Sequence, residues 1–223
     1  MGKKVQWIIS AILVITLISG CRSESVEPTI IKKLPLSPKI ELKKDETILG
    51  KIYMNETSPT RIEGVFRSTL DIYKNKLGND WHEYIDFLST QVIYSELEHV
   101  DRAFAASGEL AIGVLVDYKS RKLVGVDLRL QDYGGLKQSE RRYLMITMLR
   151  LITPNHPETE LNQLFEDAVY RAARSISRDS SICITDGDQE IIYTFELEAL
   201  NGYTRLTCKA YRASDQAILP RNY

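Results

Sequence analysis

The sequence predicts an α+β fold in which helices pack on one face of a mostly antiparallel sheet. Apolar residues recur at steps of three and four in some segments, which indicates amphipathic helices, and alternate with polar residues in others, which indicates half-buried strands. The strand-like segments also follow one another in groups, at 110–130 and 182–212, instead of alternating singly with helices. Grouped strands of this kind are typical of antiparallel sheets.

Helices are expected first. One begins near Thr60, where Thr60-Arg61-Ile62-Glu63 has the capping-box pattern, and ends at Gly78-Asn79. Its apolar face consists of Ile62, Phe66, Leu70, Tyr73 and Leu77. A second helix starts at Asp80, and its apolar spacing favours helix as far as Ser107-Gly108. Because residues 90–94 are also rich in strand-forming types, a strand there is the alternative.

A hairpin and two more helices follow. Residues 110–116 and 124–130 alternate around a polar turn, as antiparallel strands with one buried face do. The next helix is expected to be capped by Ser139 and to end at Pro154; it is apolar nearly all round, so it should be buried. Pro157 suits the first position of a last helix. That helix has the best-defined apolar face, made of Leu161, Leu164, Phe165, Ala168, Val169, Ala172 and Ile176.

The C-terminal segment predicts three strands, at 182–185, 189–199 and 203–212. Asn201-Gly202, between the last two, is a strong signal for a type I′ hairpin turn. Asp186-Gly187-Asp188 lies between the first two, with Glu190 close by. These carboxylates could serve acid–base chemistry or bind a cation. Tight turns recruit Asp and Gly for backbone reasons, however, and a turn is the preferred interpretation.

The N-terminus has the features of a bacterial secretory signal. Lys3 and Lys4 precede an apolar stretch at 5–18, which is shorter than the ~20 residues of a membrane-spanning helix. The stretch ends at Ile18-Ser19-Gly20-Cys21. These four residues resemble the lipobox of bacterial lipoproteins, which consists of a hydrophobic residue, two small residues and an invariant cysteine. The resemblance covers this segment alone and implies nothing about the fold of the rest.

This resemblance implies that residues 1–20 are a signal peptide cleaved before Cys21. Cys21 would carry a diacylglycerol thioether and an acyl chain such as palmitate on its amino group. Several acyl chains anchor a protein stably, because each buried methylene contributes ~0.8 kcal/mol. In the enterobacterial lipoproteins that the segment resembles, Asp after the cysteine tends to retain the protein in the inner membrane. Arg22 stands there, which favours the outer membrane. An ordinary signal peptide that happens to end near a cysteine is the alternative.

Composition limits the classes of function. Cleavage would remove Lys3 and Lys4 from the 29 basic residues and none of the 30 acidic ones, so the mature chain would carry a net charge of −3. Such a charge argues against a dedicated nucleic-acid binder. Residues 21–47 contain three prolines and several lysines without apolar periodicity, which indicates a tether. Residues 48–223 are expected to form a single domain, to which 40–42 or 48–53 could add an edge strand.

Cys183 and Cys208 are the cysteines that remain after lipidation, and export favours a disulfide between them. In a plain meander they would lie on strands either side of the middle one, ~9.6 Å apart. A disulfide needs Cα atoms within ~7 Å. Either the bond does not form, or the segment around Cys183 leaves the meander and approaches the last strand from its free edge or from another layer. The second alternative is our prediction.

The segment from Gly134 to Arg142 has the most unusual charge pattern. Gly134-Gly135 leads into a helix start, where free backbone N–H groups suit an anion. Basic residues near a helix N-terminus oppose the helix dipole. We therefore regard Lys137, Arg141 and Arg142 as candidate contacts for a phosphate, a carboxylate or an acidic partner surface. A solvated helix cap, with Glu140 balancing part of the charge, is the alternative.

Strong catalytic and cofactor signatures are missing from the sequence, which has no Gly-x-Ser-x-Gly, phosphate-binding loop, Cys-x-x-Cys or His-Glu-x-x-His. Glu96 and His99 are three residues apart, but exposed polarity explains them better than metal binding. No catalytic residue, metal or cofactor is predicted. The sequence favours a non-enzymatic envelope lipoprotein that contacts the bilayer through acylated Cys21. Its periplasmic or surface domain would bind another envelope protein or a glycan, or support an assembly. The alternatives are an envelope enzyme or enzyme inhibitor, and an exclusion or immunity lipoprotein.

Overall fold

The computed structural model describes residues 46–51, 61–97, 99–132, 136–200, 203–221 and 223. Several features considered above lie outside the described residues: the lipobox with Cys21, most of the tether, Thr60, Gly134-Gly135 and Asn201-Gly202. Within the described part of the chain, no helix has the length and apolar character needed to span a bilayer.

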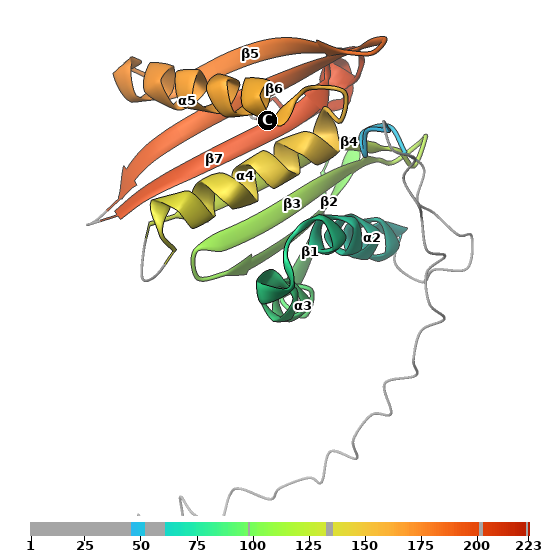
Figure 1. Cartoon of the computed structure of the whole chain (residues 1–223). Helices are drawn as coiled ribbons and strands as arrows, with labels where there is room; N and C mark the ends of the chain where they lie inside the picture. Colours follow the sequence, from blue (N-terminus) through green and yellow to red (C-terminus); the bar gives the residue numbers. More distant parts are fainter. Residues whose placement is uncertain (1–45, 52–60, 98, 133–135, 201–202, 222) are drawn as a thin grey trace, which may run out of the picture. The chain divides into compact units, whose positions relative to one another are not determined.

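The α+β prediction is confirmed. The described residues form a seven-stranded antiparallel sheet, with α-helices on one of its faces (Figure 1). The helices are α2 (Arg61–Lys76), α3 (His82–Leu88), α4 (Gln138–Ile152) and α5 (Glu158–Arg174). The strands are β1 (Val92–Glu96), β2 (Val100–Ser107), β3 (Leu110–Asp117), β4 (Leu123–Gln131), β5 (Asp179–Asp186), β6 (Gln189–Leu200) and β7 (Tyr203–Arg212).

The sheet consists of two meanders that meet in its centre. Its order is β1-β2-β3-β4-β7-β6-β5, so β1 to β4 form one meander and β5 to β7 the other. The last strand of each meander pairs with the other, from Gly125 opposite Tyr211 to Gln131 opposite Arg205. Helix α2 packs on β2 and β3, α4 on β4, and α5 on β5 and β6. The centre of the sheet is therefore covered by α4, with α5 beside it (Figure 1).

The helix predicted from Asp80 to Ser107 is wrong beyond residue 88. α3 ends at Leu88, and residues 92–107 form the β1–β2 hairpin. The hydroxyls of Ser89 and Thr90 donate hydrogen bonds to the carbonyls of Asp86 and Phe87, at 2.6 and 2.7 Å. Side chains that bond to nearby carbonyls compete with continued helix. The alternative strand at 90–94 was the correct interpretation.

The buried helix predicted at 143–152 is confirmed, because α4 buries nearly every side chain from Leu144 to Ile152. Its start differs from the prediction. Lys137, not Ser139, occupies the N-cap position, and the Lys137 N–H donates to the Glu140 carboxylate at 2.6 Å. At α5 the difference is one residue, since Pro157 precedes the helix as its cap instead of occupying its first position.

Residues 46–51 join the core and are not in a strand, while residues 40–42 and 52–53 of the edge strands considered above lie outside the described residues. Ile48 and Leu49 are buried in the main hydrophobic cluster. The Ile48 N–H donates to the carbonyl of Leu151 at 3.1 Å, and the Gly50 N–H donates to that of Leu123 at 2.7 Å. This segment therefore lies between the end of α4 and the start of β4.

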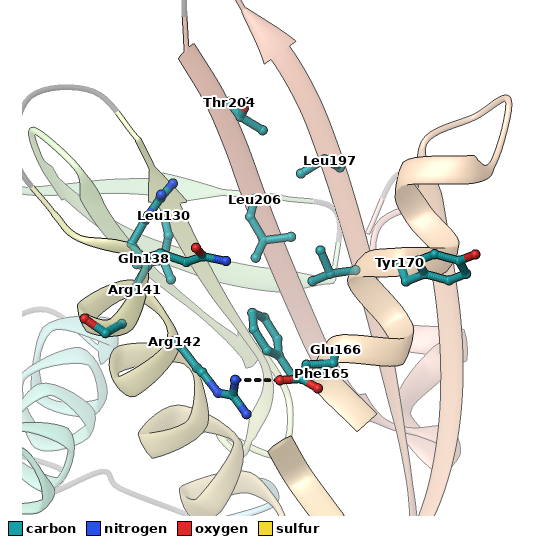
Figure 2. Close-up of a pocket in the computed structure, with 12 residues that line it drawn as sticks. Leu130, Gln138, Arg141, Arg142, Phe165, Glu166, Tyr170, Leu197, Thr204 and Leu206 are labelled. Atoms are coloured by element: carbon teal, nitrogen blue, oxygen red, sulfur yellow. Dashed lines mark ion pairs between the residues drawn. The ribbon is translucent and has the colours of Figure 1, made fainter. Parts of the chain in front are cut away.

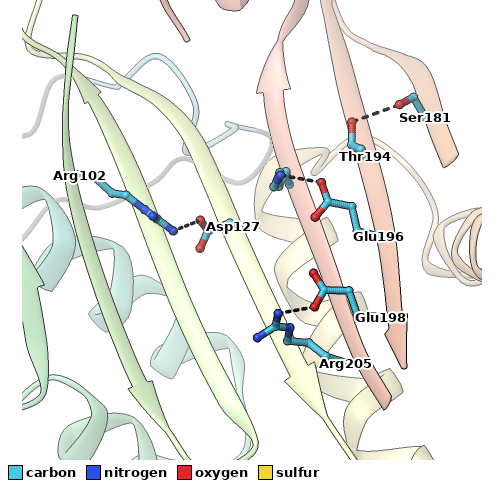
Figure 3. A network of polar contacts seen from close by, with 8 residues as sticks. Arg102, Asp127, Ser181, Thr194, Glu196, Glu198 and Arg205 are labelled. Atoms are coloured by element: carbon cyan, nitrogen blue, oxygen red, sulfur yellow. Dashed lines mark hydrogen bonds and ion pairs between the residues drawn. The ribbon is translucent and has the colours of Figure 1, made fainter. Parts of the chain in front are cut away.

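The C-terminal residues lie on the face of the sheet opposite the α-helices. A short 3-10 helix, Ala213–Ile218, follows β7. Ile218, Leu219 and Tyr223 pack on a second, small hydrophobic cluster of Val100, Leu115 and Val124. The rest of this face carries ion pairs between strands, including those of Glu196 with Lys209 and Glu198 with Arg205 (Figure 3).

The cysteine prediction is not met. β5, β6 and β7 form the plain meander, and both cysteines are free thiols. Cys183 is in register with Ile192, and Cys208 with Phe195. Because Ile192 and Phe195 are an odd number of residues apart on one strand, the two cysteines point to opposite faces of the sheet. The segment around Cys183 therefore stays in the meander, and a disulfide is excluded by direction as well as by distance.

Candidate functional site

A groove of about 740 Å³ lies between α4 and α5, above the centre of the sheet (Figure 2). We call it the α4–α5 groove. Its volume is in the range of ~300–1,000 Å³ that small-molecule sites occupy. It is lined by Leu130, Gln138, Ser139, Arg141, Arg142, Phe165, Glu166, Val169, Tyr170, Leu197, Thr204 and Leu206.

The floor of the groove is a row of three leucines on three neighbouring strands. Leu130 of β4 is in register with Leu206 of β7, which is in register with Leu197 of β6. Paired residues of an antiparallel sheet lie on the same face. All three leucines therefore face the helices. Leu130 is buried there, whereas Leu197 and Leu206 are only partly covered. Two strand spacings give this leucine row a width of ~9.6 Å.

Phe165 and Val169 of α5 form the apolar side of the groove. The sequence predicted both as core residues, but they are only partly buried. Phe165 contacts the buried ring of Phe195 edge to face, with 6.2 Å between the ring centroids. Ile176, assigned to the same apolar face, lies beyond the end of α5 and is fully exposed. The apolar face of α5 is therefore wider than the part of it that packs on the sheet. Its uncovered apolar side chains line the groove.

The opposite side of the groove carries the two arginines predicted as anion contacts. Arg141 and Arg142 lie near the start of α4 and both line the groove. Lys137 does not line it and is exposed. The structure thus brings together two of the three candidate residues, over an apolar floor that the sequence did not predict.

The two arginines differ in their partners. Arg142 connects the two helices, because its Nη1 is 2.5 Å from Glu166 Oε1 and its Nε donates to Asn162 Oδ1 at 2.8 Å. The nearest carboxylate of Arg141 is Asp132, at 3.8 Å from Nη1. Arg141 Nε is buried and has no hydrogen-bond partner among the described residues. A buried donor without an acceptor is costly, so Arg141 is the arginine of the groove whose hydrogen bonding is incomplete.

Tyr170 forms the open rim of the groove on the α5 side. Its side chain is 58% exposed, and the Arg174 guanidinium lies 4.7 Å from the centre of its ring. With Arg141 and Arg142 against Glu166, the lining side chains carry one more positive than negative charge. The site therefore combines an apolar floor with a mildly positive wall.

The other candidate features have structural roles. Asp186 is buried beside the β5–β6 turn, where its carboxylate accepts hydrogen bonds from the backbone and side-chain amides of Asn155, at 3.1 and 3.2 Å. Gly187 has a φ of +64°, so the turn interpretation is confirmed. Among the described residues, no group of three or more His, Cys, Asp or Glu side chains is placed to hold a metal ion.

No local pattern predicts the leucine row, because Leu130 joins it through the pairing of β4 with β7, which are far apart in the sequence. One indirect indication of the groove was present in the sequence. The apolar face predicted for α5 has more positions than packing on the sheet requires. Comparisons of the chain with protein-family models, with curated proteins and with solved structures find no match. The groove and the N-terminal motif are therefore the features from which a function can be inferred.

Proposed function

We propose that this protein is a lipid-anchored lipoprotein of the cell envelope, whose domain binds another envelope component in the α4–α5 groove without catalysing a reaction. The anchor part of the proposal rests on Ile18-Ser19-Gly20-Cys21 and on the lysines that precede the apolar stretch. The binding part rests on one observation, the combination of the leucine row with the arginine wall.

The groove favours a ligand with an apolar part. Leu206 and Leu197, which are partly exposed, would lose contact with water on binding, which contributes ~25 cal/mol for each Å² of apolar surface buried. A glycan offers mostly hydroxyl groups and would leave that surface poorly matched. An envelope lipid or an apolar segment of an envelope protein therefore fits the groove better than the glycan considered from the sequence.

The polar side chains of the groove suit binding more than catalysis. Glu166 is the carboxylate that lines it, and that carboxylate is engaged by Arg142. Arg141 is a permanently charged donor, which orients an acceptor but does not exchange protons near neutral pH. This arrangement supports a binding domain over the enzyme alternative.

Site-specific photo-crosslinking in cells tests the binding part. A photoreactive phenylalanine analogue replaces Tyr170 at the rim of the groove or, as a matched control, Tyr118 in the β3–β4 turn. The two residues are 58% and 55% exposed, so a neighbouring molecule can approach both. We expect a discrete adduct, identified by mass spectrometry, at position 170 and not at 118. Identical adducts at both positions, or none at 170, would overturn the proposed site.

Mass spectrometry of the N-terminal peptide tests the anchor. The mature chain should begin at Cys21 and carry the mass of a diacylglycerol and an acyl group. The Cys21→Ala variant should be released from membranes or remain as uncleaved precursor. The Arg22→Asp variant should move from the outer-membrane to the inner-membrane fraction. A mature wild-type chain without acyl mass on Cys21 would end the lipoprotein proposal.

A further inference from the structure

We propose that the ligand of the α4–α5 groove is an amphipathic organic anion, with a carboxylate bound by Arg141 and a linear apolar chain lying along the leucine row. This inference rests on the proposed function and names the class of ligand for the same site. It is argued from the observation that Arg141, whose Nε has no hydrogen-bond partner among the described residues, lines the same groove as the leucine floor.

The head-group contact is assigned to Arg141 because its donors are the less occupied of the two. Arg142 already bonds to Glu166 and Asn162. Among the described residues, the carboxylate paired with Arg141 is that of Asp132, at 3.8 Å, and it also accepts the Thr204 N–H. A guanidinium presents its donors in a planar fork that matches the two oxygens of a carboxylate. A ligand carboxylate would give Arg141 Nε the acceptor that it lacks.

The position of Arg141 sets the direction of the chain. In Figure 2 it lies beside Leu130, at the β4 side of the groove, while Leu206 and Leu197 lie further toward α5. A ligand whose head group is bound at Arg141 would therefore extend its apolar chain across the strands, along the leucine row. It meets Val169 and Phe165 on the α5 side, which are the partly buried apolar side chains of that helix.

The protein's own tether is poorly suited to occupy the groove because of its charge. Its most apolar stretch, residues 30–36, contains Lys32 and Lys33, which have the same sign as Arg141. Like charges placed together in a partly desolvated site oppose binding. A linear organic anion has a negative charge at one end, which complements Arg141, and an apolar chain, which complements the leucine row.

Isothermal titration of the full mature chain, made with Cys21→Ala so that it stays in solution without detergent, tests the inference. The probes are octanoate, decanoate and dodecanoate, each compared with the alkylammonium ion of equal length. If the added methylenes are buried, affinity should rise about fourfold for each one, from ~0.8 kcal/mol per methylene. The alkylammonium ions should bind at least tenfold more weakly than the carboxylates.

Variants of α4 locate the head group. Arg141→Gln should weaken dodecanoate binding about tenfold or more, and Arg141→Lys should weaken it less, because the charge remains without the fork. The matched control is Arg150→Gln, on the same helix but outside the groove, where Arg150 pairs with exposed Glu158. This control should stay within twofold of wild type, and thermal melting should confirm that all three variants are folded.

Equal effects of Arg141→Gln and Arg150→Gln, or affinity that does not depend on chain length, would overturn this inference. If dodecanoate fails to bind while the crosslink at position 170 still identifies an envelope protein, the ligand class is wrong and the proposed function stands. If the crosslink at position 170 is also lost, both proposals are wrong.

Discussion

The Arg102 guanidinium on β2 reaches across β3 to the Asp127 carboxylate on β4, with 3.0 Å between Arg102 Nη2 and Asp127 Oδ2 (Figure 3). Gly113 of β3, in register with Asp127, lies beneath this ion pair. A methyl group at Gly113 would overlap the Asp127 carboxylate. The ion pair therefore depends on a strand position without a side chain, on the face of the sheet opposite the α-helices.

Gly113→Ala should destabilise the protein, because the added methyl displaces a carboxylate that is only 2% exposed. Overpacking of this kind costs about 1–3 kcal/mol. Gly78→Ala is the control, since its new Cβ would be 4.0 Å from the nearest atom, Tyr143 Oη. Urea denaturation of both variants measures the difference. Equal free energies of unfolding would show that Asp127 does not occupy the space over Gly113.

Two arginines on this face should differ in their contribution to stability. Arg102→Gln leaves the buried Asp127 carboxylate without its cationic partner, and should cost about 2 kcal/mol, less than the ~3–5 kcal/mol of a fully buried pair because Arg102 is 30% exposed. Arg205→Gln removes a pair with Glu198, whose side chain is 43% exposed, and should cost less than about 1 kcal/mol. The free energies of unfolding of the two variants provide the test, and the reverse order would contradict the structure.

His156 should make stability depend on pH. Burial lowers the pKa of His156, but hydrogen bonds to the Thr185 carbonyl and the Glu160 carboxylate, with the charges of Asp186 and Glu160, raise the pKa above its ordinary value. The folded state therefore favours the protonated ring. This stabilisation is complete below the unfolded pKa of about 6.5 and is lost as the pH rises through the folded pKa.

The comparison of wild type with His156→Gln isolates this effect. The variant should lose more free energy of unfolding at about pH 5.5 than at about pH 8.5, on either side of the ordinary histidine pKa of about 6.5. Denaturant titrations at the two pH values give the numbers. A loss that is independent of pH, or larger at the higher pH, would show that the His156 ring is not held as described.

The cysteines should behave as two unlike thiols. Cys183 is exposed, whereas Cys208 is buried, and burial raises the pKa of the Cys208 thiol. A maleimide at neutral pH should label Cys183 in the folded protein and Cys208 only after denaturation, because the thiolate is the reactive form. Non-reducing peptide mapping checks the strand order as well. A Cys183–Cys208 disulfide would contradict the meander, in which the two side chains point to opposite faces.

The sequence predicted those parts of the fold that local patterns determine. The strands at 110–130 and 182–212 alternate clearly, and α4 is apolar nearly all round. Residues 92–107 were predicted as helix because Val92, Val100 and Phe104 fit helical spacing as well as strand spacing. What decides between the two is the pairing of β2 with β3 along its full length, which is a tertiary interaction.

Part of the candidate site was predictable because it too shows in local sequence patterns. Arg141 and Arg142 drew attention because basic residues are unfavourable near a helix start. Phe165 and Val169 were expected in the core, since a sequence does not reveal how far a neighbouring helix lies. The leucine row depends on β4 pairing with β7, where two meanders meet. No local pattern specifies that junction, so the groove could be identified only from the tertiary structure.

Methyl NMR of the mature chain, with dodecanoate as titrant, tests most directly whether the α4–α5 groove is the binding site. Methyl signals of Leu130, Leu197, Leu206 and Val169 should shift together and saturate at the affinity measured by calorimetry. Those of Val65 and Leu88, buried under α2 and α3, should stay in place. Shifts centred on Val65 and Leu88, or saturable dodecanoate binding that leaves the leucine row unshifted, would contradict the groove as the binding site.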